Sequence, residues 1–509
     1  MKQILFFSIF SLITIHSFSQ QITYSDPEND DTQSLDFDII GKVGNNYLVY
    51  KHIRNRYAVS VYDNTMKSIQ RTDLDFLPER TINVDFVAYP DFAYIIYQYQ
   101  KKNVLHCDAA AIDGNGNIIK KPFPVDTTHI SFFADNKIYS TINSEDKSKI
   151  MVYKIQKKND RFYFTTLLLN DSLQLIRKSN MVADYEEHKD IFSDFYVDDE
   201  GNFIFTIGAK ANSRDYLQTL YLITKPFDSD VFKSDQLNLA GNFLDEIKLK
   251  IDNENKQYLL NSLYYTKRNG NVEGLYTAVW NKQHDTLVSQ TFARFSDTLR
   301  SMARSEGSSK YAFNDYFIRD VILKKDGGFI LTAEDQTAQT RGTPWNRYDY
   351  LYGYNRFYAP YDGYMIYPPY YYPGFSPYYG YSNPYYYGQP MRFYYQNIVI
   401  LDLDKSGNMI WNNVVHKSQF DDNTDRYLSY GKIVTGGKIH FLFNELERHT
   451  QLINDQSVTP DGQVILNPPL RSLDRSHEFM PRYAKQVSYY QIIVPCTFRN
   501  YICFAKIDY

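Results

Sequence analysis

The sequence predicts an all-β fold on the strength of three observations. Short apolar runs alternate with turn-forming clusters along the 509 residues, and no long segment shows the 3.6-residue period of a helix. A small turn motif recurs between these runs. The 48 tyrosines far outnumber the 3 tryptophans, and tyrosine is enriched on the pleated, half-buried surfaces of sheets.

Many segments read as strands because they are short, apolar and bounded by turn residues. Examples are residues 45–53, 57–63, 92–100, 161–169, 201–209, 218–225, 327–334 and 396–404. Helical candidates are few, and the best of them, 241–251, reads equally well as a strand. We therefore expect hairpins to follow one another without helices between them.

The recurring turn motif is Asp-x-x-Gly-Asn, framed by apolar residues. It stands at 113–117, 198–202 and 404–408, with relatives in 324–331 and 459–466. Weaker variants without the glycine occur in 61–69 and 169–176. The aspartate side chain can cap a turn and glycine tolerates a positive φ, so each motif predicts a hairpin whose return strand is the following apolar run.

The spacing of the motif suggests a repeat. Asp113 and Asp198 lie 85 residues apart, which equals two units of a repeat of about 40–45 residues. Many short hairpins of this kind predict a β-propeller of seven or eight blades, with a pair of β-sandwiches as the alternative. A propeller closes on itself and leaves no long sheet edge exposed, which suits a secreted β protein of this size.

These turns resemble those of exported bacterial β-propeller-like repeat proteins. The resemblance spans most of the chain and implies a single propeller-like domain over residues 20–509. Neither a WD dipeptide nor a di-glycine kelch signature recurs, so the resemblance names no specific family.

The first 19 residues have the pattern of a signal peptide. Lys2 precedes the apolar run 4–15, and Ser17 and Ser19 place small residues before a cleavage site at Gln20 or Gln21. The run is too short for a membrane-spanning helix, and no transmembrane segment is expected elsewhere. We therefore expect an exported protein that is periplasmic, associated with the outer membrane, or extracellular.

Two of the three cysteines, Cys496 and Cys503, frame a short terminal hairpin in CTFRNYIC. If Arg499 and Asn500 form a two-residue turn, Cys496 faces Cys503, and the paired strands bring them within reach of a disulfide. Export makes oxidation feasible. The alternative is a pair of buried free thiols.

A Tyr/Pro/Gly-rich block interrupts the repeat at residues 345–395. Strand-like sequence stands on both sides, so the block is expected to be an insertion between two strands. Its prolines forbid a continuous helix or a central strand. Three interpretations stay open: a loop without a role, a lid on the propeller face, or a recognition loop.

We favour the recognition loop, because tyrosine combines a rigid apolar ring with a polar tip, as contact surfaces require. The expected partner is an envelope protein or a glycan. The predicted contact residues are Tyr367, Tyr370, Tyr371, Tyr372, Tyr378, Tyr379, Tyr385, Tyr386 and Tyr387.

Known catalytic signatures are missing from the sequence. It contains no HExxH helix, P-loop or G-x-S-x-G elbow, and its glycine-rich turns lack the acid at the twelfth position of a calcium loop. No catalytic residue, metal or cofactor is predicted. The formal charge of −4 and the scattered basic residues argue against nucleic-acid binding.

The leading functional hypothesis is therefore an exported, non-enzymatic binding or scaffold protein of the cell envelope. One version of it is an accessory subunit of an outer-membrane secretion or uptake complex. The alternative is a propeller-type glycoside hydrolase or polysaccharide lyase, which would need several carboxylates to converge in a pocket. Acid pairs such as Asp198-Asp199 could contribute to such a pocket.

Overall fold

The structure, a computed structural model, is built almost entirely of antiparallel strands. It describes residues 20–28, 35–54, 56–134, 137–158, 161–184, 189–212, 215–268, 270–340, 346–352, 391–422, 424–447, 450–470, 477–499 and 501–509. Within these ranges the helical elements are short: α1 (Asp297–Ala303), α2 (Arg347–Tyr352) and two 3-10 turns, Ser309–Tyr311 and Pro481–Tyr483. The all-β prediction is confirmed. None of the helices in these ranges is long and apolar enough to cross a membrane.

The first three sheets each contain four strands that follow one another in chain order. The first comprises β2 (Leu35–Val43), β3 (Asn46–Ile53), β4 (Arg56–Tyr62) and β5 (Ser68–Asp73). The second comprises β6 (Thr81–Ala88), β7 (Phe92–Lys101), β8 (Val104–Asp113) and β9 (Ile118–His129). The third comprises β10 (Ser140–Asn143), β11 (Lys149–Lys158), β12 (Arg161–Asn170) and β13 (Leu175–Asp184).

A ten-stranded sheet follows, and it consists of two groups of strands. The first group is β14 (Asp190–Phe192), β15 (Tyr196–Val197), β16 (Phe203–Lys210), β17 (Leu217–Lys225) and β18 (Lys233–Leu237). The second is β19 (Phe243–Leu244), β20 (Lys248–Asp252), β21 (Gln257–Tyr265), β22 (Gly274–Asn281) and β23 (Thr286–Arg294). Among the described residues, a single pair of strand partners, Leu217 of β17 with Leu244 of β19, connects the two groups within the sheet.

Three more sheets complete the order. The first contains β24 (Tyr316–Leu323), β25 (Phe329–Thr340), β26 (Met391–Leu403), β27 (Met409–Val415) and β28 (Gln419–Asp422). The next contains β29 (Gly431–Thr435), β30 (Lys438–Glu447), β31 (Thr450–Val458) and β32 (Val464–Leu466). The last contains β33 (His477–Phe479), β34 (Lys485–Ser488), β35 (Gln491–Phe498), β36 (Tyr501–Asp508) and β1 (Gln21–Tyr24).

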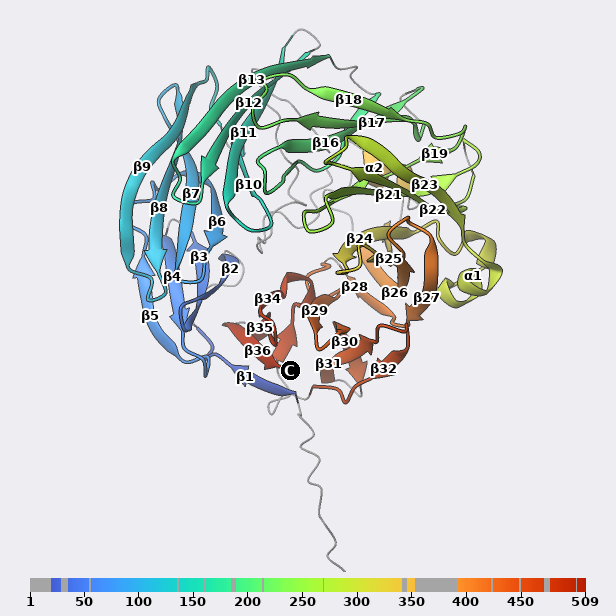
Figure 1. Ribbon diagram of the computed structural model, residues 1–509. Coiled ribbons are helices and arrows are strands. Elements are labelled where there is room, and N and C mark those ends of the chain that lie inside the picture. Colours follow the sequence, from blue (N-terminus) through green and yellow to red (C-terminus); the bar gives the residue numbers. More distant parts are fainter. Residues whose placement is uncertain are drawn as a thin grey trace, which may run out of the picture.

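The sheets succeed one another around a ring in Figure 1, from blue to red in chain order. The N-terminal strand β1 does not belong to the first sheet. It pairs antiparallel with the C-terminal strand β36, from Gln21 opposite Asp508 to Tyr24 opposite Ala505. The two ends of the described chain therefore meet in one sheet.

The three Asp-x-x-Gly-Asn motifs form the predicted hairpin turns. They join β8 to β9, β15 to β16, and β26 to β27, all antiparallel pairs. In each turn the aspartate accepts the backbone N–H of the residue four positions later, at 2.8–2.9 Å. The glycines Gly116, Gly201 and Gly407 have φ values of +78°, +94° and +78°, which explains why glycine occupies the fourth position.

The two variants without glycine adopt the same turn. Met66 and Leu173 take the left-handed conformation at φ +60° and +59°. Both side chains are buried among the apolar residues of neighbouring sheets. Packing of these side chains compensates for a backbone conformation that costs a non-glycine residue about 1 kcal/mol or more.

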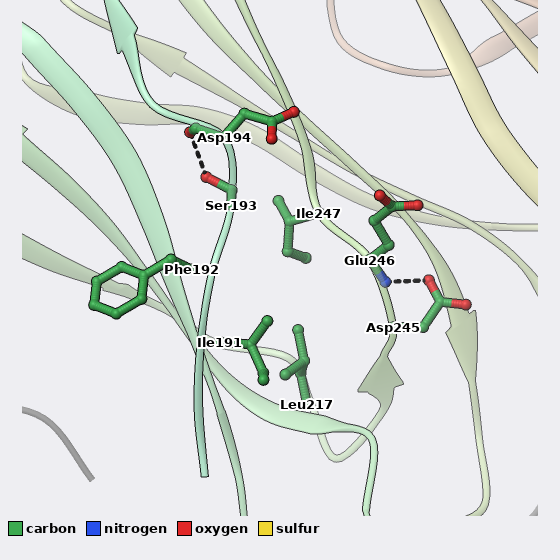
Figure 2. A pocket seen from close by; sticks show the side chains of 8 residues that line it. All are labelled: Ile191, Phe192, Ser193, Asp194, Leu217, Asp245, Glu246 and Ile247. Atoms are coloured by element: carbon green, nitrogen blue, oxygen red, sulfur yellow. Dashed lines mark hydrogen bonds between the residues drawn. The ribbon is translucent and has the colours of Figure 1, made fainter. Parts of the chain in front are cut away.

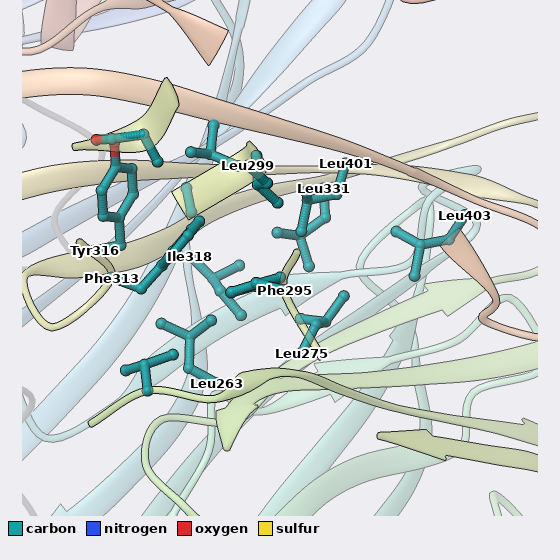
Figure 3. Packing of buried hydrophobic residues seen from close by; sticks show 14 of the residues in the cluster. Leu263, Leu275, Phe295, Leu299, Phe313, Tyr316, Ile318, Leu331, Leu401 and Leu403 are labelled. Carbon is teal, nitrogen blue, oxygen red and sulfur yellow. The ribbon is translucent and has the colours of Figure 1, made fainter. Parts of the chain in front are cut away.

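The largest apolar cluster lies where the ten-stranded sheet meets the sheet of β24–β28. Figure 3 shows Leu263 and Leu275 of the former packing with Ile318, Leu331 and Leu401 of the latter. Helix α1 covers this contact, with Leu299 almost fully buried. The sequence did not predict α1, whose start is capped by the Ser296 hydroxyl accepting the Leu299 N–H at 3.1 Å.

Candidate functional site

A short three-stranded extension of the sheet of β24–β28 leads into the Tyr/Pro/Gly-rich block. From here on, the Tyr/Pro/Gly-rich segment means residues 353–390 of that block. Strands β25 and β26 stay paired up to Thr340 opposite Met391, and β28 adds to β26 from Gln419 to Asp422. We call residues 336–340, 391–395 and 419–422 the stalk. Because β25 and β26 are neighbours in the sheet, residues 341–390 connect two adjacent strands.

The predicted boundaries of the insertion need a correction. Residues 391–395 belong to β26, and Tyr395 within them is fully buried. At the other end, residues 347–352 form α2. The predicted boundary was wrong because Tyr394 and Tyr395, at the start of β26, continue the tyrosine-rich composition of the block. Their burial nevertheless alternates as it does along a strand, with Tyr395 buried and Tyr394 partly exposed.

The stalk has a small apolar core of its own. Ala338, Met391, Phe393, Tyr395 and Leu428 form this cluster, separate from the clusters between the larger sheets. On the outside, the Arg392 guanidinium donates to both carboxylate oxygens of Asp422 at 2.6 and 2.9 Å. A hairpin alone is marginally stable, whereas three strands with a core form a firm support.

Two β-bulges concentrate polar groups at the base of the stalk. Arg319 is the extra residue of β24, and β26 carries one residue more than β25 between Glu334 and Gln336. Bulges re-aim side chains. Here Arg319 donates from Nε to Glu334 Oε2 at 3.1 Å and from Nη2 to Gln336 Oε1 at 2.6 Å.

Glu334 is the centre of a buried ion cluster. Its carboxylate lies 2.8 Å from Lys417 Nζ, and both side chains are 0 % exposed. Ser429 Oγ also donates to Glu334, at 2.7 Å. Burial disfavours the charge, but Lys417 and Arg319 outweigh it and hold the pKa of Glu334 below its ordinary value.

Tyr395 connects this cluster to a second ion pair. Its hydroxyl donates to Asp425 Oδ2 at 3.0 Å and accepts from Arg482 Nη2 at 2.6 Å, while Arg482 is also paired with Asp425. Three cations lie over the Tyr395 ring, with Arg319, Lys417 and Arg482 at 5.8, 5.9 and 5.1 Å from its centre. The start of β26 is thus fixed by charge-assisted hydrogen bonds and cation–π contacts.

Helix α2 anchors the other end of the segment. Arg347 donates from Nη2 and Nε to Asp245 Oδ2 at 2.8 and 3.1 Å, and both side chains are buried. The Tyr265 hydroxyl donates to the same oxygen at 3.0 Å. Arg347 also stacks over Phe317, 4.1 Å from the ring centre. Buried ion pairs therefore hold the chain on both sides of residues 353–390.

Asp335 is a buried carboxyl group of this region whose pKa lies near neutral pH. Burial raises its pKa to about 7, while the Ser305 hydroxyl, which donates to Oδ2 at 2.6 Å, opposes the rise. A carboxyl with this pKa can hold or release a proton near neutrality. However, the neighbouring carboxylates are already paired, Glu334 with the buried Lys417 and Asp425 with the partly buried Arg482, which is typical of a structural cluster.

The predicted contact tyrosines, from Tyr367 to Tyr387, lie outside the described residues. Both members of the acid pair Asp198-Asp199 lie among the described residues, and they have different roles. Asp198 is buried, capping its turn and accepting the Tyr258 hydroxyl at 3.0 Å, whereas Asp199 accepts a backbone N–H of a neighbouring turn. Asp198 therefore has a structural role.

The terminal hairpin has the predicted register. Cys496 stands opposite Cys503, Thr497 opposite Ile502 and Phe498 opposite Tyr501. The structure places the two residues as free thiols with the sulfur atoms 2.7 Å apart, so the disulfide stays a prediction. The third cysteine, Cys107, is also buried and free.

A small pocket lies beside the α2 anchor, between the two groups of the ten-stranded sheet. Figure 2 shows Ile191, Leu217 and Ile247 lining it, with three acidic residues at its rim. Two of these acids are already paired, Asp245 with Arg347 and Glu246 with Lys248. Within the described ranges, no group of three or more metal-ligating side chains gathers in one place.

Sequence reasoning missed the anchoring residues. Glu334 and Lys417 are charged residues inside or beside strand-like apolar runs, and that position could have marked them as buried and paired. Asp245 and Arg347 carry no such signal, because these two residues pair with each other and lie 102 positions apart in the chain.

Comparison with known proteins yields only distant structural similarity. No protein-family model matches the sequence, and no curated protein matches it. Among solved structures, prolyl oligopeptidase B from Galerina marginata aligns over 93 % of this chain and 54 % of its own, with a TM-score of 0.39 and 7 % identity. This chain thus spans about half the length of that protein.

Two further structures align over most of both chains. The polysaccharide lyase Uly1 matches over 83 % of this chain and 89 % of its own, with a TM-score of 0.37 and 8 % identity. The apocarotenoid oxygenase of Synechocystis matches over 96 % and 93 %, with a TM-score of 0.33 and 9 % identity. At these scores the similarity identifies neither a family nor an activity.

Proposed function

We propose that the chain is a closed, eight-bladed β-propeller. Dividing the ten-stranded sheet at its single Leu217–Leu244 pair turns seven sheets into eight groups of four or five strands. The pairing of β1 with β36 supports closure, because propellers commonly complete one blade with strands from both chain ends. Two β-sandwiches would require four sheets, fewer than the described strands form.

We further propose that this scaffold is an exported, non-enzymatic binding or scaffold protein of the cell envelope. The Tyr/Pro/Gly-rich segment is its contact element, and an accessory role in an outer-membrane secretion or uptake complex is one form of this function. The observation that carries the proposal is the anchoring of the segment on both sides, by Arg347–Asp245 and by the Tyr395–Asp425–Arg482 cluster.

Burying charged groups destabilises a protein unless every charge is paired. A segment without a role would give no reason for such an anchor to be present. A fixed base lowers the entropy lost when the segment binds a partner, which is the benefit of preorganisation. Residues 365–390 contain neither lysine nor acid. Recognition by this segment would therefore rely on aromatic rings and hydroxyls, which suits a glycan or an envelope protein.

The test combines two variants of the exported protein with a matched control. In the first, Tyr370, Tyr371, Tyr372, Tyr385, Tyr386 and Tyr387 are replaced by serine. In the second, residues 354–390 are replaced by a flexible Gly/Ser linker that keeps α2 and β26. The control replaces Tyr489 and Tyr490, which are exposed on the turn between β34 and β35, by serine.

Cross-linking in the native envelope identifies the partners of the wild-type protein. Both segment variants should fold and lose these partners, with affinity falling roughly thirtyfold or more for each lost aromatic anchor. The control should retain them. If the serine variant keeps every partner of the wild type, the segment is not the contact element. If the wild-type protein degrades envelope polysaccharides and both variants do so equally, the glycosidase or lyase alternative replaces this proposal.

A further inference from the structure

The N-terminal segment joins the last sheet to the first. Beyond β1, Ser25 N–H donates to Phe504 O at 2.9 Å and Glu28 N–H donates to Ile502 O at 3.1 Å. Glu28 also pairs with Lys51 of β3, 2.7 Å away, and the Lys51 side chain is 0 % exposed. We call residues 21–28 together with β36 the seam, because the sheets at the two chain ends are connected there.

One cysteine of the terminal hairpin, Cys503, belongs to β36 and hence to the seam, and the other, Cys496, lies opposite it on β35. Cys503 stands between Ile502 and Phe504, the residues whose carbonyls bind the N-terminal segment. Cys496 faces it on β35, the two sulfur atoms are 2.7 Å apart, and both residues are 0 % exposed. A bond between these sulfurs would link β36 covalently to β35 at the point where β36 holds the N-terminal segment.

We propose that Cys496 and Cys503 form a redox switch of the seam, which we call the latch. In the dithiol form, the seam can open by separation of β36 from β35. In the disulfide form, these two strands cannot separate. Sheets open locally with free energies below that of global unfolding, and strands at a chain end are the first to separate. In the dithiol protein, β36 and the N-terminal segment can leave β35 together. In the disulfide protein, opening is confined to β1 and its continuation. This inference is independent of the proposed binding function.

The chemistry requires an external disulfide as oxidant, of the kind present in export compartments. The Cys503 thiolate attacks one sulfur of that disulfide and releases a thiolate. The Cys496 thiolate then displaces the second sulfur, so that the protein loses two electrons and two protons and the oxidant becomes two thiols. A hydrogen bond from Cys496 lowers the pKa of Cys503 to about 7 against the effect of burial, and the nearby His477 adds to this.

Burial adds a kinetic consequence. With both sulfurs inaccessible, a disulfide reagent can react only before the seam forms or while it is open. The rate of oxidation of the folded dithiol protein therefore measures the opening that the proposal describes.

The experiment is hydrogen exchange followed by mass spectrometry on the mature, full-length protein. One sample is oxidised with glutathione disulfide during refolding and the other is kept reduced. The intact oxidised protein should be lighter by two hydrogen atoms. Amides of β36 should exchange about tenfold more slowly, or slower still, in the oxidised sample. The hairpin of β12 and β13, which contains no cysteine, should exchange equally in both.

Two variants keep the result interpretable. Cys107→Ala retains the pair and should show the full redox effect. Cys496→Ala removes the pair and should exchange identically under both conditions. If the wild type does not lose two hydrogen atoms on oxidation, or if it loses them and β36 exchange does not change, the latch is disproved.

Discussion

Carboxylates at the hairpin turns and carboxylates at the base of the stalk are satisfied in opposite ways. Asp113 and Asp404 are partly exposed and accept backbone N–H groups two and four residues along the chain. Glu334 and Asp425 are buried, and their cations, Lys417 and Arg482, come from 83 and 57 residues away. The first arrangement forms as soon as the turn forms, whereas the second exists only when distant sheets have packed.

The difference explains what each region can do. A turn satisfied by its own residues makes a hairpin that depends little on its neighbours. The stalk cluster joins β25 and β26 to Ser429 before β29 and to Arg482 before β34, so it couples three sheets to the Tyr/Pro/Gly-rich segment. Four predictions test this contrast, beginning with the largest expected effect.

Replacing Lys417 by methionine should destabilise the protein by about 3 kcal/mol, because Glu334 then stays buried with one of its two cations missing. Urea unfolding at pH 7 measures the loss. The double variant Lys417→Met, Glu334→Gln should recover most of it, since no uncompensated charge remains. A loss below about 1 kcal/mol in the single variant would mean that water or Arg319 alone satisfies Glu334.

Asp335 should make stability depend on pH in the neutral range. Its pKa is raised to about 7 by burial, so between the unfolded value of about 3.9 and pH 7 the native state binds more protons than the unfolded state. Stability should therefore fall as the pH rises from about 4 to about 7. Asp335→Asn should remove this slope, which is at most about 1.4 kcal/mol per pH unit, and should be more stable than the wild type at pH 8. Parallel profiles of the two proteins would contradict the assignment.

The sequence revealed the turn region far better than the stalk, and the reason is physical. A cap such as Asp404 with Gly407 and Asn408 lies within five residues, so the motif contains every interacting group. The same turn is visible in the sequence even where Met66 replaces glycine, because the capping aspartate remains. The partners of Glu334 and Asp245 are set by the packing of sheets, which no local pattern encodes.

The composition of the segment also hid its ends. Tyr395 continues the tyrosine-rich block in sequence but is a core residue of the stalk. Alternation of buried Met391, Phe393 and Tyr395 with more exposed Arg392 and Tyr394 was the signal that marked the start of β26.

The stability lost on replacing a turn glycine by alanine should depend on the atoms that surround the added Cβ. A Cβ added at Gly407 would lie 2.6 Å from Thr277 Cγ2, a buried and stiff side chain, and the residue has φ +78°. Gly407→Ala should therefore cost about 2–3 kcal/mol. Gly241 has nearly the same φ, +79°, and nothing within 4 Å of its added Cβ. Gly241→Ala should cost only about 1 kcal/mol. Equal losses in thermal unfolding would show that strain alone, without the clash, decides the effect.

The smallest effect is expected from the turn cap itself, and its pH dependence has the opposite sign to that of Asp335. Slight burial opposes ionisation, but N–H donors from Asn408 and Ser406 hold the pKa of Asp404 below its ordinary value. The unfolded state then binds more protons than the native state near pH 4, so the stabilisation is present above that pH and is lost as the pH falls. Asp404→Ala should cost about 1 kcal/mol at pH 7, and the two proteins should converge below about pH 3. A difference that persists undiminished at pH 2.5 would show that the side chain acts by packing and that the turn does not depend on a charged cap.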